Sequence, residues 1–96
     1  MTKEEREYLS KVAALGCAIC SRLGYPDSPG EIHHRRTGTG VGKRASNWET
    51  VCLCPEHHRG NTGLHGLGRK RFERVYGITE LELIAETKRM VGYEPI

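Results

Sequence analysis

Aromatic residues and long apolar stretches are both scarce in this 96-residue chain. Aromatic side chains make up 6% of it, with one Trp and one Phe, and hydrophobic residues make up 36%. No apolar run approaches the roughly 18 residues that a membrane span needs. The first ten residues are charged and lack the apolar segment of a secretory signal. We therefore expect a cytoplasmic protein with no membrane partner, whose small core needs an added constraint.

Four cysteines and five histidines can supply that constraint through a metal ion. Thiols stay reduced in the cytoplasm, so clustered cysteines there favour metal binding over disulfides. Cys17 and Cys20 form one pair with two intervening residues, and Cys54 and His57 form another. This spacing lets both ligand atoms of a pair converge on one tetrahedral ion. The two pairs predict a structural Zn2+ site, with buried reduced thiols as the alternative.

Cys52 leaves a second ligand set open. It lies two residues before Cys54 on the same expected strand, so both face the same side and Cys52 can replace His57. We favour His57, because a helix that starts just after Cys54 repeats the geometry of the first pair. Cys52 is then a small core residue, as isolated buried cysteines commonly are.

The positive charge is concentrated in one part of the chain. The formal net charge is +3, but residues 35–74 carry nine basic and three acidic residues, and the rest is net acidic. The basic excess surrounds the histidines, which indicates a polyanion as the binding partner. A solvated charged face is the alternative interpretation.

Helix and turn signals predict a single α+β domain over residues 1–96. Capping boxes formed by Thr2 with Glu5 and by Thr79 with Glu82 each predict the start of a helix. Cys17-Ala-Ile-Cys20 is expected as a tight turn, and residues 36–46 as a Gly-rich loop. The expected elements are helices 3–15, 67–76 and 80–91, strands 31–35 and 49–54, and a short helix from Pro55.

Several of these residues carry a resemblance to known nucleases. His33 and His34, Asn47, and the stretch LCPEHH at 53–58 resemble the HNH, or ββα-metal, endonuclease superfamily. The longer pattern IHHRRTGTGVGKRASNW…LCPEHHRG…GLHGLGRKRFERVYG is similar to the phage recombination-enhancement family of RecA-dependent nucleases. The resemblance covers residues 17–77, and implies a ββα-metal core there with the helices at 3–15 and 80–91 flanking it.

The resemblance also implies an activity and roles for the histidines. The activity is that of a metal-dependent, sequence-nonspecific DNA endonuclease of phage or prophage origin. His34 is implied as the general base, and His33 and His58 as ligands of a catalytic Mg2+ or Mn2+, with Zn2+ as a further possibility. Neighbouring residues on a strand point to opposite faces, which agrees with different roles for His33 and His34. Asn47 is implied to brace the loop through hydrogen bonds to backbone.

His65 and RecA complete what the resemblance suggests. His65 follows His58 by seven residues and is a candidate third ligand, although Gly60-Asn61-Thr62-Gly63 interrupts the helix between them. Its alternative is a histidine that lies against the following Gly-Leu-Gly turn. RecA filaments are a suggested partner, although family members carry a basic N-terminal extension where this chain has an acidic helix.

Basic side chains around the histidines are expected to contact DNA phosphates. They are Arg35, Arg36, Lys43, Arg44, Arg59, Arg69, Lys70 and Arg71. No residue clearly reads a base edge, so we expect little sequence specificity. The rival functions are a noncatalytic zinc-binding nucleic-acid module and a nuclease that acts on RNA. One zinc site uses four ligands and leaves four of the histidines without a structural role, which favours a nuclease.

Overall fold

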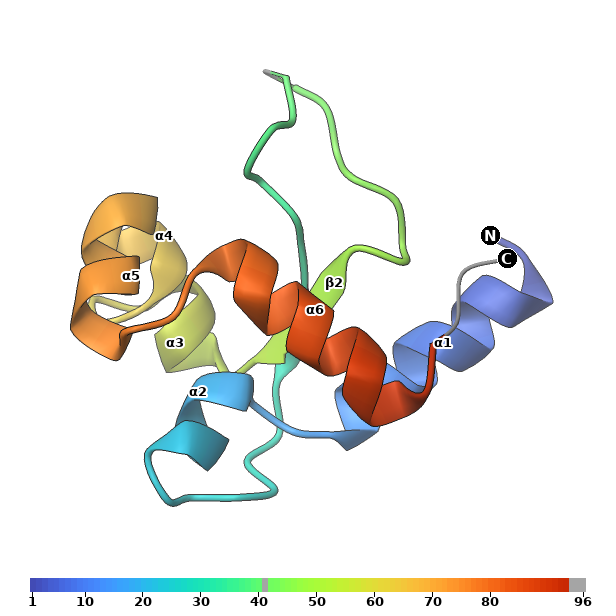
Figure 1. The fold of residues 1–96 in the computed structure, drawn as a ribbon, viewed down its shortest axis with the longest axis horizontal. Helices are drawn as coiled ribbons and strands as arrows, with labels where there is room; N and C mark the ends of the chain where they lie inside the picture. Colours follow the sequence, from blue (N-terminus) through green and yellow to red (C-terminus); the bar gives the residue numbers. More distant parts are fainter. Residues whose placement is uncertain (41, 94–96) are drawn as a thin grey trace.

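A two-stranded antiparallel sheet lies at the centre of the molecule, with helices on both of its faces (Figure 1). The computed structural model describes residues 1–40 and 42–93. The elements are α1 (Lys3–Ala14), α2 (Ala18–Arg22), β1 (Glu31–His34), β2 (Thr50–Leu53), α3 (Pro55–Arg59), α4 (Leu64–Leu67), α5 (Arg69–Tyr76) and α6 (Glu80–Val91). This arrangement confirms the predicted α+β fold class. Within the described residues, the helices are too short or too polar to span a bilayer.

The two long helices begin where the capping boxes predict. The Thr2 hydroxyl accepts the backbone N–H of Glu5 at 3.1 Å, and Oε1 of Glu5 accepts the backbone N–H of Thr2 at 2.9 Å. Thr79 and Glu82 repeat both bonds at the start of α6. Each box satisfies two backbone donors that the first turn of a helix otherwise leaves unpaired.

Two local expectations were wrong. Cys17-Ala-Ile-Cys20 is the start of α2 instead of a tight turn, because Sγ of Cys17 accepts the backbone N–H of Cys20 and caps the helix. The single helix expected over 67–76 is divided into α4 and α5 at Gly68. Gly68 has a φ of +83°, a left-handed value that glycine adopts without a Cβ clash and that a continuous helix cannot contain.

β2 is buried along its whole length and separates two apolar clusters. Val51 and Leu53 pack with Phe72 in the cluster formed with α2, α5 and α6. Cys52 faces the other way and packs with Val12 of α1. Figure 1 shows α6 crossing the sheet, with α1 next to its C-terminal half. Both faces of the sheet are therefore covered by helices.

The strand register places the two adjacent histidines on different faces. His33 lies opposite Val51, and His34 lies opposite Thr50. Side chains of directly opposed residues share a face, so His33 points toward the α6 side and His34 toward the α1 side. The alternation predicted from the sequence is therefore present, and the two imidazoles meet different surroundings.

We expect Gly30, just before β1, to tolerate no side chain. A Cβ at this position would lie 2.6 Å from Sγ of Cys52 and 2.8 Å from the carbonyl of Leu53, which belongs to a buried strand. Gly30→Ala should therefore lower the free energy of unfolding by about 1–3 kcal/mol. Gly40→Ala is the matched control, since its Cβ would make only an ordinary 3.7 Å contact with Lys43. Urea unfolding measures both, and equal midpoints would contradict this account of the strand entry.

Candidate functional site

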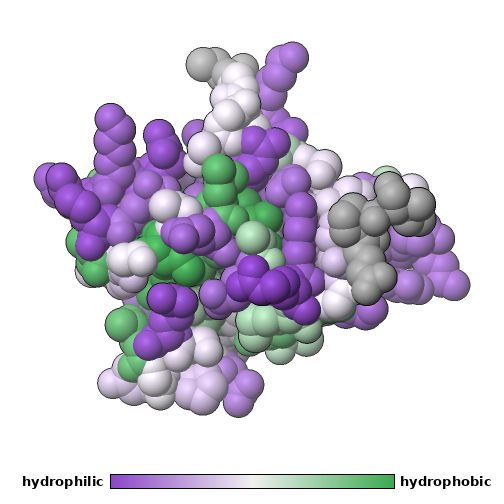
Figure 2. Space-filling view, in the orientation of Figure 1, coloured by the Kyte–Doolittle hydropathy of each residue, from purple (hydrophilic) through white to green (hydrophobic). Residues whose placement is uncertain are grey.

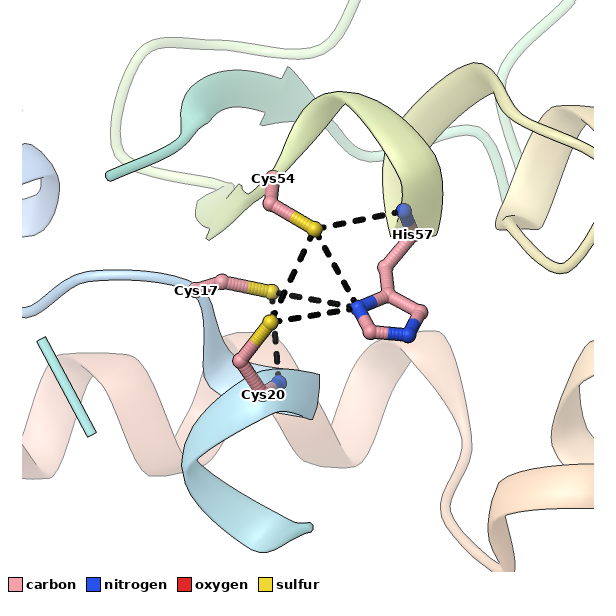
Figure 3. Close-up of side chains that lie close together, drawn as sticks. All are labelled: Cys17, Cys20, Cys54 and His57. Atoms are coloured by element: carbon pink, nitrogen blue, oxygen red, sulfur yellow. Dashed lines mark hydrogen bonds between the residues drawn. The ribbon is translucent and has the colours of Figure 1, made fainter. Parts of the chain in front are cut away.

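Three cysteines and one histidine converge from the starts of α2 and α3 (Figure 3). The two pairs are built alike. Cys17 caps α2 and its Sγ accepts the N–H of Cys20 at 3.3 Å, and Cys54 caps α3 and its Sγ accepts the N–H of His57 at 3.4 Å. In each pair the capping bond turns the second ligand residue toward the first. The structure therefore brings together the four residues that the sequence predicts as one zinc site.

The spacing of these four side chains matches a tetrahedral metal site. Sγ of Cys20 lies 3.7 Å from Sγ of Cys54, and Nδ1 of His57 lies 3.7, 3.4 and 3.2 Å from the three sulfur atoms. Zn–S bonds of about 2.3 Å and Zn–N bonds of about 2.0 Å separate tetrahedral ligand atoms by about 3.5–3.8 Å. Three thiolates and one imidazole are also a donor set that Zn2+ prefers. The cluster fits a structural zinc ion.

Cys52 lies outside this cluster. It is 2% exposed and packs against α1, with its Sγ 4.0 Å from the carbonyl oxygen of Ala13. Burial raises the pKa of Cys52 to about 11, as it does that of Cys20 inside the cluster, so the position of Cys52 and not its pKa excludes it from the site. The expected alternation fails because β2 ends at Leu53, and Cys54 already belongs to the turn into α3. His57 is the fourth member of the cluster.

A second cluster consists of His33 from β1, His58 from α3 and His65 from α4. The ring centroids are 4.8–5.5 Å apart, and one nitrogen of each ring lies within 4.8 Å of the others. The glycines between α3 and α4 reverse the chain and return His65 to His58. Partial desolvation, with His58 and His33 close by, lowers the pKa of His65, which favours a neutral imidazole with a free lone pair. Three such nitrogens can hold one metal ion.

A buried carboxylate fixes the orientation of His33. Nε2 of His33 donates to Oε2 of Glu80 at 2.6 Å, and the two side chains are 2% and 1% exposed. Glu80 also accepts the backbone N–H groups of Arg36 and Thr37 and the Thr37 hydroxyl. Burial alone raises the pKa of Glu80, but these hydrogen bonds outweigh it and lower the pKa to about 2. Since Nε2 is engaged, His33 would present Nδ1 to a metal ion.

A second carboxylate orients His58 in the same way. Nδ1 of His58 donates to Oε1 of Glu31 at 2.8 Å, which leaves Nε2 for a metal ion. Arg59 binds the other carboxylate oxygen at 3.0 Å. Hydrogen bonds from Arg59 and His58 lower the pKa of Glu31 to about 2. The structure thus pairs Arg59 with Glu31, whereas the sequence predicts it at DNA phosphates.

His34 belongs to a separate hydrogen-bond chain. Its Nε2 lies 2.8 Å from Oδ1 of Asn47, and Nδ2 of Asn47 donates to Oε2 of Glu5 at 2.9 Å. The resemblance implied side-chain bonds from Asn47 to backbone. Its side-chain amide instead bonds the side chains of His34 and Glu5. The backbone carbonyl of Asn47 accepts the Thr50 hydroxyl and so takes part in the end of the loop. Asn47 therefore links α1 to the histidine pair.

The sequence did not reveal the three carboxylates that support the histidines, two by direct contact and Glu5 through Asn47. Glu31 shares a strand face with His33 at a spacing of two, a signal that could have found it. Glu5 was interpreted only as part of a capping box. Glu80 has no local signal, because the groups that surround it lie more than 40 residues earlier in the chain.

A cleft of about 410 Å³ joins both histidine groups to the Gly-rich loop. Its lining includes His34 and the three clustered histidines, together with Arg36, Lys43 and Arg44. Arg36 and His65 also line an adjacent hollow that reaches Arg69 at the start of α5. Figure 2 shows hydrophilic side chains gathered at the left of the molecule, over α5. The exposed basic residues there include Arg69, Lys70, Arg71 and Arg74.

Arg35 differs from the other basic residues of the loop. Its guanidinium donates to the carbonyl oxygen of Thr37, so the side chain folds back on its own loop. The backbone N–H of Arg35 pairs with the carbonyl of Glu49 across the base of the loop. The structure therefore places Arg35 in the support of the loop, although the sequence predicts it as a phosphate ligand.

We expect one tightly held zinc ion per chain at the Cys17, Cys20, Cys54 and His57 cluster. Cys54→Ala removes a thiolate and the cap of α3, so metal retained after dialysis against a mild chelator should fall by about one ion per chain. Zinc binding of this type contributes on the order of 10 kcal/mol to folding, so the variant should also lose its folded circular-dichroism signal. Cys52→Ala, the matched control, should keep both metal and fold. A zinc-free wild type that remains folded would contradict the site.

Comparison with known proteins extends the resemblance to nearly the whole chain. The family model described as "Recombination enhancement, RecA-dependent nuclease" matches residues 1–92. A search of curated proteins found no match. The matched range contains both clusters, the cleft and the flanking helices α1 and α6. The chain therefore belongs to the family of recombination-enhancement, RecA-dependent nucleases.

Proposed function

We propose that this nuclease is a metal-dependent DNA endonuclease of the HNH type, with its active site in the cleft between the Gly-rich loop and α4. The observation that carries the proposal is the cluster of His33, His58 and His65. Two of these imidazoles are held from behind by carboxylates, which leaves one nitrogen of each free toward the others. Such carboxylate–histidine pairs are the usual support of metal ligands. A purely structural zinc module has no need of a second such site.

The reaction needs positive charge near the scissile phosphate and a group that accepts a proton from water. A divalent ion bound by the three histidines would stabilise the negative charge that develops on the phosphate and leaving oxygens. Imidazole donors suit Zn2+ best, whereas Mg2+ and Mn2+ both prefer oxygen ligands, and Mn2+ accepts nitrogen donors more readily than Mg2+ does. His34 borders the same cleft from the opposite face of β1 and does not belong to the cluster, so it is free to act as the general base.

The basic surface supports DNA as the substrate. Arg36, Lys43 and Arg44 line the cleft, and the adjacent hollow leads from Arg36 to Arg69. A phosphate backbone that crosses the histidines would thus meet positive charge on both sides. Contacts of this kind go to phosphates and carry no sequence information. The proposal therefore includes cleavage without sequence preference, and action together with RecA filaments, as the family description suggests.

The base and the metal ligands should fail in different ways when each is replaced. His34→Ala removes the proton acceptor and should slow cleavage by about 10²- to 10⁴-fold without weakening metal or DNA binding. His33→Ala and His58→Ala remove ligands, so their defects should shrink as Mn2+ is raised. The measurement is nicking of supercoiled plasmid and cleavage of single-stranded DNA, with and without RecA. The same metal-dependent recovery in His34→Ala and His33→Ala would refute this division of roles.

DNA binding should depend on charge more than on sequence. Replacing Lys43 or Arg44 with Ala should weaken binding to unrelated duplexes equally and reduce the slope of log K against log salt by about 1 for each lost phosphate contact. Arg89→Ala serves as the control, since this exposed residue of α6 lines none of the hollows at the cleft. Fluorescence anisotropy at several salt concentrations measures these slopes. A loss confined to one DNA sequence would contradict nonspecific binding.

A further inference from the structure

The carboxylate of Glu5 takes part in two separate interactions. Oε1 accepts the backbone N–H of Thr2 at 2.9 Å and completes the capping box of α1. Oε2 accepts Nδ2 of Asn47 at 2.9 Å, and Oδ1 of Asn47 lies 2.8 Å from Nε2 of His34. The capping box accounts for the first oxygen only. The second oxygen connects a residue in the first turn of α1 to the histidine pair.

The direction of this chain follows from what each group can donate. The hydrogen bonds from the Thr2 backbone and from Asn47 lower the pKa of Glu5, so its carboxylate is ionised and only accepts. Asn47 must therefore turn its NH₂ group toward Glu5 and its oxygen toward His34. An amide oxygen also only accepts, so Nε2 of His34 carries the proton. In the neutral imidazole, Nδ1 of His34 then keeps its lone pair.

We propose that Glu5 is a positioning residue for the general base. It fixes the orientation of the Asn47 amide, which holds His34 in the tautomer whose Nδ1 can take a proton from water. Without Glu5, the amide is free to turn over and donate to Nε2, which moves the ring proton to Nδ1 and removes the acceptor. This role rests on the proposed nuclease function, in which His34 is the base.

The chain offers a control that separates positioning from helix capping. Each variant removes one of the two bonds of the capping box. Thr2→Ala removes the bond from the Glu5 backbone to the Thr2 hydroxyl and leaves Oε2 of Glu5 in place for Asn47, whereas Glu5→Ala removes the bond from the Thr2 backbone to Oε1 together with Oε2. Thr2→Ala and Glu5→Ala should both lower the Tm by about 5 °C. Only Glu5→Ala should lower kcat, by about 10- to 100-fold, with the KM for DNA unchanged. An equal kcat in the two variants, or a change in KM alone, would overturn the proposal.

A double-mutant cycle tests whether Glu5 acts through Asn47. In an Asn47→Ala background, Glu5→Ala should have no further effect on kcat, because the amide that it orients is gone. Thr2→Ala should leave kcat unchanged in either background. Independent, additive losses from Glu5→Ala and Asn47→Ala would show that Glu5 acts by another route and overturn the proposal.

A measurement without DNA separates this inference from the nuclease proposal. Two-bond ¹H–¹⁵N NMR of histidine rings, at a pH well above the ordinary His pKa of about 6.5, reports which nitrogen carries the proton. The wild type and Thr2→Ala should show His34 protonated on Nε2, and Glu5→Ala should show a mixture of tautomers. Protonation on Nδ1 in the wild type, or the same pure tautomer in all three proteins, would overturn the inference. A wild type with the expected tautomer but no cleavage of DNA would support the positioning and refute the nuclease mechanism.

Discussion

One buried carboxylate, that of Glu80, holds α6 to β1 and to the Gly-rich loop. It stands at the start of α6 and accepts four hydrogen bonds, from His33, from the Arg36 backbone, and from the backbone and hydroxyl of Thr37. Removing an ionised carboxylate from water is costly, and only a full set of donors offsets that cost. The donors come from the end of β1 and the first residues of the Gly-rich loop. The packing of α6 against the sheet and the direction of the loop therefore both depend on the Glu80 carboxylate, which also orients His33.

The short helix α3 connects the two clusters. Cys54 caps it and His57 follows within its first turn, and both belong to the cluster with Cys17 and Cys20. His58, the next residue, points to the other histidines. A helix of five residues has little stability of its own, because nucleation costs more than so few hydrogen bonds return. The cluster of three cysteines and His57 thus stabilises the small core and also fixes the helix from which His58 reaches its partners.

Local chemistry explains why some features could be predicted from the sequence. The capping boxes at Thr2 and Thr79 are patterns within four residues, and the structure has both helices start where they place them. The spacing of Cys17 with Cys20 is also local and predicted that the two side chains converge, although it did not predict the helix that begins between them. The alternation of His33 and His34 is equally local. It is confirmed by the strand register. The α+β class could be predicted because most helices and strands carry a local sequence signal of this kind.

The remaining features depend on contacts between distant parts of the chain. Glu80 meets Thr37 across 43 residues, and Glu5 meets Asn47 across 42, so no periodicity or spacing marks either pair. Glu5 was hidden by its own local role, since the capping box already explained a glutamate at that position. Cys52 lies in the core, as the favoured interpretation had it. The alternative in which it replaces His57 fails because the strand rule behind it extends one residue past the point where β2 ends.

His57 and His58 are adjacent in α3 and belong to different clusters, so one helical turn sets the direction of a side chain in each cluster. Each residue advances an α-helix by about 100°, so deleting or inserting one residue between Cys54 and His57 would rotate both imidazoles away from their partners at once. The loop between β1 and β2 is bonded to the helices at its two ends, where Thr37 and Asn47 are held, and the described residues between these ends make hydrogen bonds only within the loop. Changes of length at its tip cost little closure entropy. Insertions can therefore lengthen the basic loop without moving either cluster, whereas a change of length in the first turn of α3 moves a histidine of each cluster.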